Sequence, residues 1–258
     1  MPFYQDAAAT EPLTAIHLVQ RTKRCFQLTQ PIYYRAEEAS AIIRINAHDL
    51  SAGLINNSTD LASVPTWMWG LIASYGRQTA PALLHDQRMA ECSTLPAGEA
   101  LRLRRVYDEE FRRALLDTGV AALRARLMWA GISIQAYLEH SRVRGLLLAA
   151  SVGVGALALI AAIWLAAAGV GPLPITAAVL LTGLLCLAWA RDWPVLVVMV
   201  PAFALFSPVL AAAAAGSLLL WLCETGWWAV SKPFVRHPGP PPVVGPLART
   251  RSHDPDHK

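Results

Sequence analysis

A long stretch almost free of charge is the feature that most constrains how this chain can fold. Residues 145–230 contain only three charged side chains, those of Arg191, Asp192 and Glu224. The first part of this stretch, residues 146–171, is uncharged throughout and exceeds the roughly 20 apolar residues that a helix needs to span a bilayer. Because so few polar side chains could face water, we expect residues 145–230 to form an all-α membrane bundle in contact with the lipid bilayer.

The number of spans depends on how the second part of this stretch divides. Residues 146–171 and 175–190 make two spans, and residues 194–230 are too long for one span but long enough for two. Proline interrupts helices, because it lacks a backbone N–H and its ring clashes with the preceding turn. A break near Pro201 and Pro208 would therefore give four spans in all, and its absence would give three.

Basic residues on both sides of the apolar stretch favour the even number. Arg142 and Arg144 precede it, and Lys232 and Arg236 follow it. Since Lys and Arg concentrate in cytoplasmic segments, both flanks are expected in the cytoplasm. The sequence thus predicts a multi-pass cell-membrane protein with four spans, three being the alternative, whose soluble domain and C-terminus are cytoplasmic. Residues 231–258 are basic and rich in proline, which predicts a disordered tail.

The part of the chain before this stretch has the charge content of a soluble domain. Only 16% of the whole chain is charged, against roughly 25% in soluble domains, but most of its charged residues precede residue 145. We expect residues 1–24 to be a flexible N-terminus and residues 25–140 to be a soluble α+β domain.

The expected domain combines a small antiparallel sheet with about three helices. Residues 25–35 and 41–47 are rich in β-branched and aromatic residues and are separated by a short polar segment, which predicts a strand pair. Amphipathic patterns with plausible start and stop residues predict helices at residues 81–92, 99–117 and 120–139.

Composition also argues against some classes of function. The net charge of +4 is spread over Arg-rich helices and the tail, with no aromatic residues interleaved for stacking, so nucleic-acid binding has little support. Four cysteines without a CxxC pair fit a reduced compartment rather than a disulfide or zinc framework. Nothing in the pattern identifies a protein partner.

The clearest candidate site is His85-Asp86, in the helix expected at residues 81–92. Burying a charge is costly unless the charge is paired or coordinated. If this helix and the next form an antiparallel pair, Asp108 falls opposite the first turns of the histidine's helix. A histidine held by a carboxylate on a neighbouring helix is the arrangement of an oriented general base. The alternative is structural, with Asp108 paired to Arg104 one turn earlier.

Asp86 suggests a second role for this helix. It projects about 100° around the helix from the preceding histidine and so cannot share that histidine's contacts. The loop before the helix supplies further oxygen atoms from Thr59, Asp60 and Ser63. Hard cations such as Ca²⁺ prefer oxygen ligands, so a Ca²⁺ site at Asp86 and Asp60 is expected if the helix is functional. The alternative is that Thr59 and Asp60 stabilise a turn.

These motifs resemble those of a known family. Residues 26–134 resemble a domain family of unknown function found in tailed phages, prophages and bacteria. The resemblance rests on T-D-L-A-S-V-P at 59–65, A-L-L-H-D at 82–86, and Asp108 followed by Phe111. The family usually has W-x-Y after its His-Asp pair, whereas this chain has Gln-Arg-Met, so any pocket here has a different far wall.

The helix pair of that family is in turn weakly similar to the catalytic helices of secreted phospholipase A₂. This similarity implies that His85 activates water, Asp86 holds Ca²⁺ and Asp108 orients His85. The glycine-rich calcium loop and the disulfides of that enzyme have no counterpart here. A competing analogy, the His-Asp phosphohydrolases with His48 as first ligand, fits less well because that fold is all-helical and His48 follows an expected strand.

Three functions remain open from the sequence. The first is a membrane-anchored, metal-assisted hydrolase that acts on an ester of a lipid or of the cell envelope through the His-Asp site. The second is a non-catalytic binding or structural membrane protein of phage or prophage origin. The third is a membrane component whose spans carry the function, but transport is disfavoured because the spans have almost no polar residues to line a path.

Overall fold

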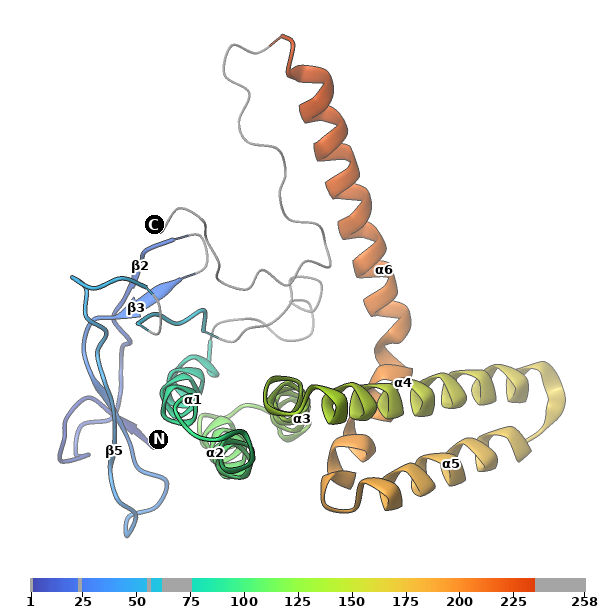
Figure 1. Cartoon of the computed structure of the whole chain (residues 1–258), viewed down its shortest axis with the longest axis horizontal. Helices are drawn as coiled ribbons and strands as arrows, with labels where there is room; N and C mark the ends of the chain where they lie inside the picture. Colours follow the sequence, from blue (N-terminus) through green and yellow to red (C-terminus); the bar gives the residue numbers. More distant parts are fainter. Residues whose placement is uncertain (1, 23–24, 55–56, 62–75, 235–258) are drawn as a thin grey trace. The chain divides into compact units, whose positions relative to one another are not determined.

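The computed structural model describes residues 2–22, 25–54, 57–61 and 76–234 (Figure 1). The chain divides into two compact units. The first contains the described residues up to Ala204, and the second contains the remainder of the last helix, from Leu205. The candidate site lies wholly in the first unit.

Within the residues that the structure describes, five short strands form two antiparallel sheets near the start of the chain. One sheet has the order β1-β4-β5 and the other pairs β2 with β3. The expected strand pair is confirmed by β4 and β5, in which Ile32 lies opposite Ile45. The strands are β1 (Phe3–Tyr4), β2 (Leu18–Gln20), β3 (Phe26–Leu28), β4 (Ile32–Tyr34) and β5 (Ile43–Ile45).

The sequence interpretation missed two features of these sheets. The single strand expected at residues 25–35 is two strands, β3 and β4, divided around Pro31, and each belongs to a different sheet. Residues 1–24, expected to be flexible, contribute β1 and β2. Phe3 is 2% exposed and its ring lies 4.9 Å from that of Tyr34, so burial of an aromatic side chain fixes this segment.

The three expected helices are confirmed, with ends that shift by only one or two residues. They are α1 (Thr79–Cys92), α2 (Ala97–Asp117) and α3 (Ala122–His140). Pro81 lies in the first turn of α1, where its missing N–H costs nothing. Gly119 follows α2 with φ of +79°, a left-handed conformation that suits glycine at a helix end.

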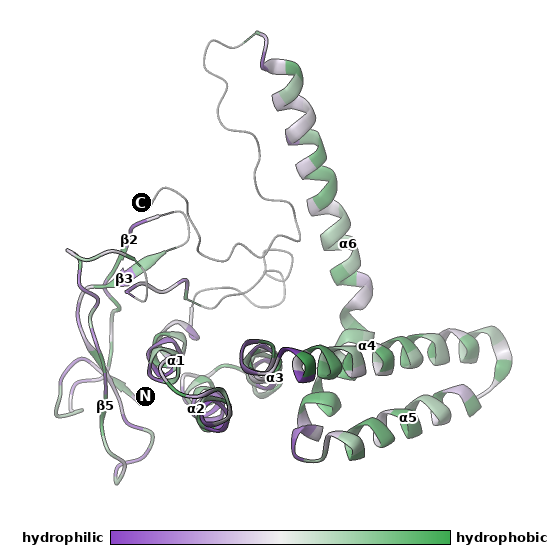
Figure 2. Ribbon diagram, viewed as in Figure 1, coloured by the Kyte–Doolittle hydropathy of each residue, from purple (hydrophilic) through white to green (hydrophobic). Residues whose placement is uncertain are grey.

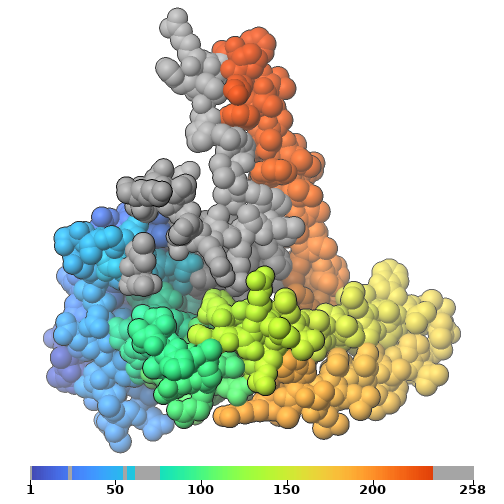
Figure 3. All heavy atoms as spheres, viewed as in Figure 1, coloured from blue at the N-terminus to red at the C-terminus, as the bar shows by residue number. Residues whose placement is uncertain are grey.

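The sheets and the first two helices share one hydrophobic core. Leu28, Tyr34 and Ile45 from the strands pack with Leu84 of α1 and Ala114 of α2. In the space-filling view the strand region, in blue, lies directly against the green atoms of the helices (Figure 3). This core fixes α1 between the sheets and α2, and so determines which side chains of the two helices face each other.

The apolar stretch is helical throughout most of its length. Its helices are α4 (Arg142–Leu165), α5 (Leu173–Trp189) and α6 (Trp193–Ser231), with the 3₁₀ turn η3 (Ala190–Asp192) between the last two. Figure 2 shows that apolar residues surround each of them on most sides. Two segments, Arg142–Val170 and Leu173–Ser231, are long and apolar enough to cross a membrane by length and composition.

The break expected near Pro201 and Pro208 is absent. One helix, α6, runs through both prolines without interruption. Proline removes a single backbone bond, and an apolar helix can tolerate this because the remaining backbone groups have no better partners in a non-aqueous environment. Residues 145–230 therefore contain three helices where four spans were favoured. How often the chain crosses a bilayer, and whether these helices form a bundle, stay predictions.

Helices on the two sides of the domain boundary expected at residue 140 pack closely against each other. Ala130 and Tyr137 of α3 share a second hydrophobic cluster with Leu148 of α4 and Leu196 of α6. The turn between α3 and α4 is tight enough to require Gly145, where an added Cβ would lie 2.6 Å from the backbone nitrogen of Leu138. The helices of the α+β part thus pack directly on the start of the apolar part.

Candidate functional site

His85 and Asp108 meet between α1 and α2, as the antiparallel helix pair predicts. His85 Nε2 lies 3.1 Å from Asp108 Oδ1. The His85 side chain is 11% exposed and that of Asp108 is 1% exposed. The imidazole also packs against Phe111, with ring centroids 5.0 Å apart. The pair is therefore nearly buried, with the histidine on the more exposed side.

Asp108 has a second charged neighbour besides His85. The Arg104 guanidinium, 4% exposed, lies 3.8 Å from Asp108 Oδ1 and donates a 2.9 Å hydrogen bond to Glu139. A carboxylate can only accept hydrogen bonds, so an Asp108 carboxylate requires His85 to donate from Nε2. Neutral His85 then keeps an unprotonated Nδ1, for which the described part of the chain provides no hydrogen-bond partner. The structural alternative, an Arg104–Asp108 pair, coexists with this contact.

Asp86 faces a different neighbour, as its position around the helix requires. The hydroxyl of Thr59 donates a 2.5 Å hydrogen bond to Asp86 Oδ2 and accepts one from the Leu61 N–H at 2.9 Å. Thr59 also pairs through its backbone with Phe26, so it ties the loop to the sheet. Asp86 is partly exposed but densely surrounded by protein, and this burial, together with the nearby Asp60 charge, raises its pKa to about 7.

The donor set around Asp86 does not by itself suit a resident calcium ion. Asp86 and Asp60 are close enough to repel each other, yet within the described ranges no three His, Cys, Asp or Glu side chains gather to hold a metal. Ca²⁺ takes six to eight oxygen ligands. Ser63, the remaining expected ligand, lies outside the described residues. Calcium binding by Asp86 and Asp60 stays an expectation, and the contact between His85 and Asp108 does not depend on it.

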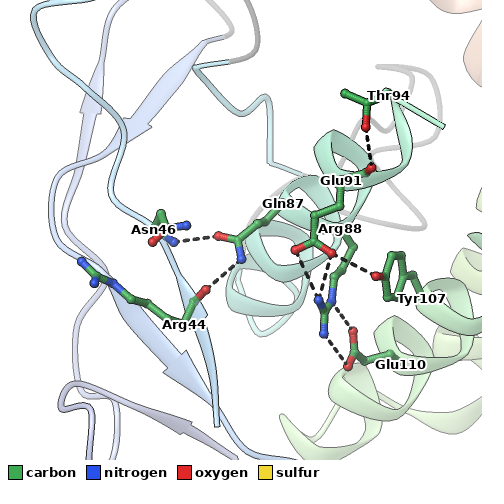
Figure 4. A network of polar contacts seen from close by, with 8 residues as sticks. All are labelled: Arg44, Asn46, Gln87, Arg88, Glu91, Thr94, Tyr107 and Glu110. Carbon is green, nitrogen blue, oxygen red and sulfur yellow. Dashed lines mark hydrogen bonds and ion pairs between the residues drawn. The ribbon is translucent and has the colours of Figure 1, made fainter. Parts of the chain in front are cut away.

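The two residues after His85-Asp86 take structural roles that the sequence interpretation did not foresee. Figure 4 shows Gln87 reaching from α1 to the backbone of β5 and of the residue after it. Its side chain accepts from the Asn46 N–H at 2.7 Å and donates to the Arg44 carbonyl at 2.8 Å. A glutamine amide has both a donor and an acceptor, which match the unpaired carbonyl and N–H of a strand edge. This match is the sequence signal that could have predicted the contact.

Arg88 joins α1 to α2 in the same view (Figure 4). It donates to Glu110 at 2.9 Å and to Glu91 at 3.0 Å, and its guanidinium lies 4.6 Å from the centre of the Tyr107 ring. Several partners in one network fix a charged side chain better than an isolated surface pair does. The network holds the helix pair in register and so maintains the contact between His85 and Asp108.

Replacing Gln87 with methionine is expected to destabilise the protein by about 1–2 kcal/mol, because two hydrogen bonds are lost while the bulk of the side chain is kept. Thermal unfolding of the purified chain in detergent would measure this. Alanine at the same position should destabilise about as much, since the contact depends on hydrogen bonds rather than packing. A methionine variant as stable as the wild type would contradict the role given to Gln87.

His48 serves the sheet rather than a metal. Its ring Nδ1 accepts a 2.7 Å hydrogen bond from the Leu28 backbone N–H, and the backbone N–H of His48 donates to the Leu28 carbonyl at 2.8 Å. Burial lowers the pKa of His48, which favours the neutral form that this bond requires. This arrangement therefore gives no support to the His-Asp phosphohydrolase analogy, in which His48 is the first metal ligand.

A cavity of about 200 Å³ lies beside Asp108, on the side away from the sheets. It is lined by residues of α2, α3, η3 and the start of α6. Asp192, Arg105 and Tyr137 form its polar wall. Asp192 accepts hydrogen bonds from Arg105 at 2.9 Å and from the Tyr137 hydroxyl at 2.5 Å. These residues are far apart in the sequence, and no local pattern could have joined them. His85 does not line the cavity.

Comparison with known proteins identifies one domain. Residues 26–132 match a family described as "Protein of unknown function (DUF1353)". The match covers less than half of the chain and includes both helices of the site. No curated protein and no solved structure matches the chain.

Proposed function

We propose that this chain is a membrane-associated hydrolase in which His85 is the general base and Asp108 the positioning residue. The observation that carries the proposal is the 3.1 Å contact between His85 Nε2 and Asp108 Oδ1 in a nearly buried setting. In this proposal neutral His85 carries its proton on Nε2, where it donates to Asp108. The lone pair on Nδ1 is then available to take a proton from water.

The reaction that fits this pair best is the hydrolysis of an ester. One oriented base can deprotonate an attacking water, and it can return the proton to the leaving alcohol. The two apolar segments favour a substrate that resides at a membrane, such as an ester of a lipid or of the cell envelope. The phospholipase-like assignment of roles is retained for His85 and Asp108, whereas Asp86 is assigned to its bond with Thr59.

The proposal is tested by replacing Asp108 with asparagine in the full-length chain, purified in detergent. An asparagine amide can turn its NH₂ toward Nε2 and so favour the tautomer that carries its proton on Nδ1. We expect ester hydrolysis to fall by about 10²–10⁴-fold, as losses of oriented bases do. Nitrogen-15 NMR of labelled histidine, assigned by difference with a His85 variant, should show the proton moving from Nε2 to Nδ1.

The matched control is Asp117→Asn, an exposed carboxylate on the same helix, which should change neither the rate nor the spectrum. Short-chain nitrophenyl esters and phospholipid vesicles are suitable first substrates. Wild-type protein that hydrolyses none of them, or an Asp108→Asn variant that keeps the wild-type rate, would refute the proposal.

A second candidate function, a non-catalytic binding module, is favoured by one observation. The cavity of about 200 Å³ is lined by Asp108 and not by His85. In that case the His85–Asp108 pair is part of the scaffold and the cavity is the functional feature. The two candidates differ in the hydrolysis assay and not in the NMR spectrum: a scaffold pair would show the same NMR change in Asp108→Asn but would have no hydrolysis to lose.

A further inference from the structure

The cavity beside Asp108 is lined by two residues that each carry a buried polar atom without a hydrogen-bond partner. Asp108 Oδ2 is one and Arg105 Nε is the other, within the described part of the chain. Asp108 uses its Oδ1 for His85, and Arg105 uses its terminal nitrogen for Asp192 and Tyr137. Both side chains have charged partners, Asp108 also in the Arg104 guanidinium 3.8 Å away, but each leaves one buried polar atom unsatisfied. An unsatisfied buried polar atom is costly, so both atoms favour a ligand that can satisfy them.

The two unsatisfied atoms need opposite kinds of hydrogen-bond partner. A carboxylate oxygen needs a donor, and a guanidinium N–H needs an acceptor. The remaining charge nearby is balanced in the same way, since Asp192 is engaged by Arg105 while Arg191, also on the cavity wall, is exposed. A ligand that carries an ammonium group at one end and an anion at the other would match the acceptor at Asp108 and the cations at Arg105 and Arg191.

The size and lining of the cavity narrow the ligand further. About 200 Å³ is the room taken by roughly seven water molecules, enough for a small polar headgroup and too little for acyl chains. Trp129 and Tyr137 supply aromatic side chains beside Asp108, and an ammonium group is attracted to aromatic faces. Of the common small zwitterions, phosphoethanolamine has an ammonium that donates hydrogen bonds, whereas the choline group has none to donate.

The position of the cavity in the chain favours a lipid as the source of this group. One wall is the turn η3, which joins the apolar helices α5 and α6. Trp189 and Trp193 flank this turn, and tryptophan is enriched where membrane segments meet the headgroup layer. A site at the ends of such helices lies where headgroups, rather than acyl chains, would be found.

We propose that this cavity binds the headgroup of an ethanolamine phospholipid, with the ammonium on Asp108 Oδ2 and the phosphate on Arg105 and Arg191. The inference concerns binding and holds whether or not His85 acts as a base. Phosphatidylethanolamine in a bilayer and free phosphoethanolamine share this chemistry, so the experiment must separate the two sources.

Binding is measured by calorimetry on the full-length chain in a sugar-based detergent. We expect phosphoethanolamine to bind about tenfold or more tightly than phosphocholine or inorganic phosphate, because the donor to Asp108 is lost in both. Phosphatidylethanolamine added to the micelles should bind more tightly still if the lipid is the source. Tighter binding of free phosphoethanolamine than of phosphatidylethanolamine would assign the site to a soluble ligand and overturn the lipid part of the proposal.

Three variants locate the binding. Ser133→Phe, which places a ring in the cavity and leaves the charged side chains of its wall in place, should abolish binding, and Arg191→Gln should weaken it severalfold. Arg102→Gln removes the same charge from the exposed face of α2 and should leave binding unchanged. Ser133→Phe should also keep the wild-type unfolding temperature, which excludes misfolding as the cause. Equal binding of ethanolamine and choline compounds, binding that survives Ser133→Phe, or no binding of any compound would overturn the proposal.

Discussion

Replacing His85 with glutamine is expected to reduce ester hydrolysis by about 10²–10⁴-fold, the usual contribution of a positioned general base. Glutamine keeps a polar group that can donate to Asp108 but has no lone pair of imidazole basicity. The buried carboxylate therefore stays partnered, and the fold should be retained. Initial rates of ester hydrolysis by the full-length chain, together with the unfolding temperature, measure both effects.

Two controls make this result specific to the site. His17→Gln changes an exposed histidine and should leave the rate unaltered. His48→Gln removes the acceptor for the Leu28 N–H and should lower the unfolding temperature more than the rate. A His85→Gln variant with the wild-type rate would show that His85 is structural.

Replacing Asp86 with asparagine is expected to remove a dependence of stability on pH. The pKa of Asp86 is raised from 3.8 to about 7 in the folded chain, so the folded state holds a proton that the unfolded state releases. Stability from this group is fully present below pH 3.8 and is lost as pH rises to 7. The free energy of unfolding should therefore fall over this window by about 2–4 kcal/mol in the wild type.

Asparagine keeps an oxygen that can accept from Thr59 but does not ionise. Relative to the wild type, Asp86→Asn should gain stability between pH 5 and about 8, as measured by unfolding in detergent over that range. Glu38→Gln, at an exposed position, should not reproduce the gain. Parallel pH profiles for the wild type and Asp86→Asn would contradict the assignment. A stabilisation by Ca²⁺ that only the wild type shows would support the expected calcium site.

The helices of the site could be predicted because each carries a strong local pattern. Chain order then placed Asp108 opposite His85, since two helices joined by a short loop must run antiparallel. The sheets were harder to predict because their strands are only two or three residues long, which is too short for an alternating pattern. The division at Pro31 and the recruitment of Phe3 follow from tertiary burial and not from local preference.

The cavity could not have been predicted from the sequence at all. Its polar wall joins Arg105 to Asp192, which are 87 positions apart. Arg191-Asp192 has the composition of an ordinary loop between apolar helices. Only the packing of α3 on α4 and on the start of α6 brings this loop to Tyr137. Contacts between distant segments of this kind leave no periodic trace in a single sequence.

The unbroken length of α6 has a geometric consequence. Its 39 residues rise about 58 Å at 1.5 Å per residue, while the hydrocarbon core of a bilayer is about 30 Å thick. Even tilted by about 40°, at the upper end of observed tilts, the helix would extend about 45 Å along the bilayer normal. Any bilayer that α6 crosses must therefore leave several turns of it outside the hydrocarbon. The side chains of those turns, which are largely apolar, would then lie in the headgroup layer or in water.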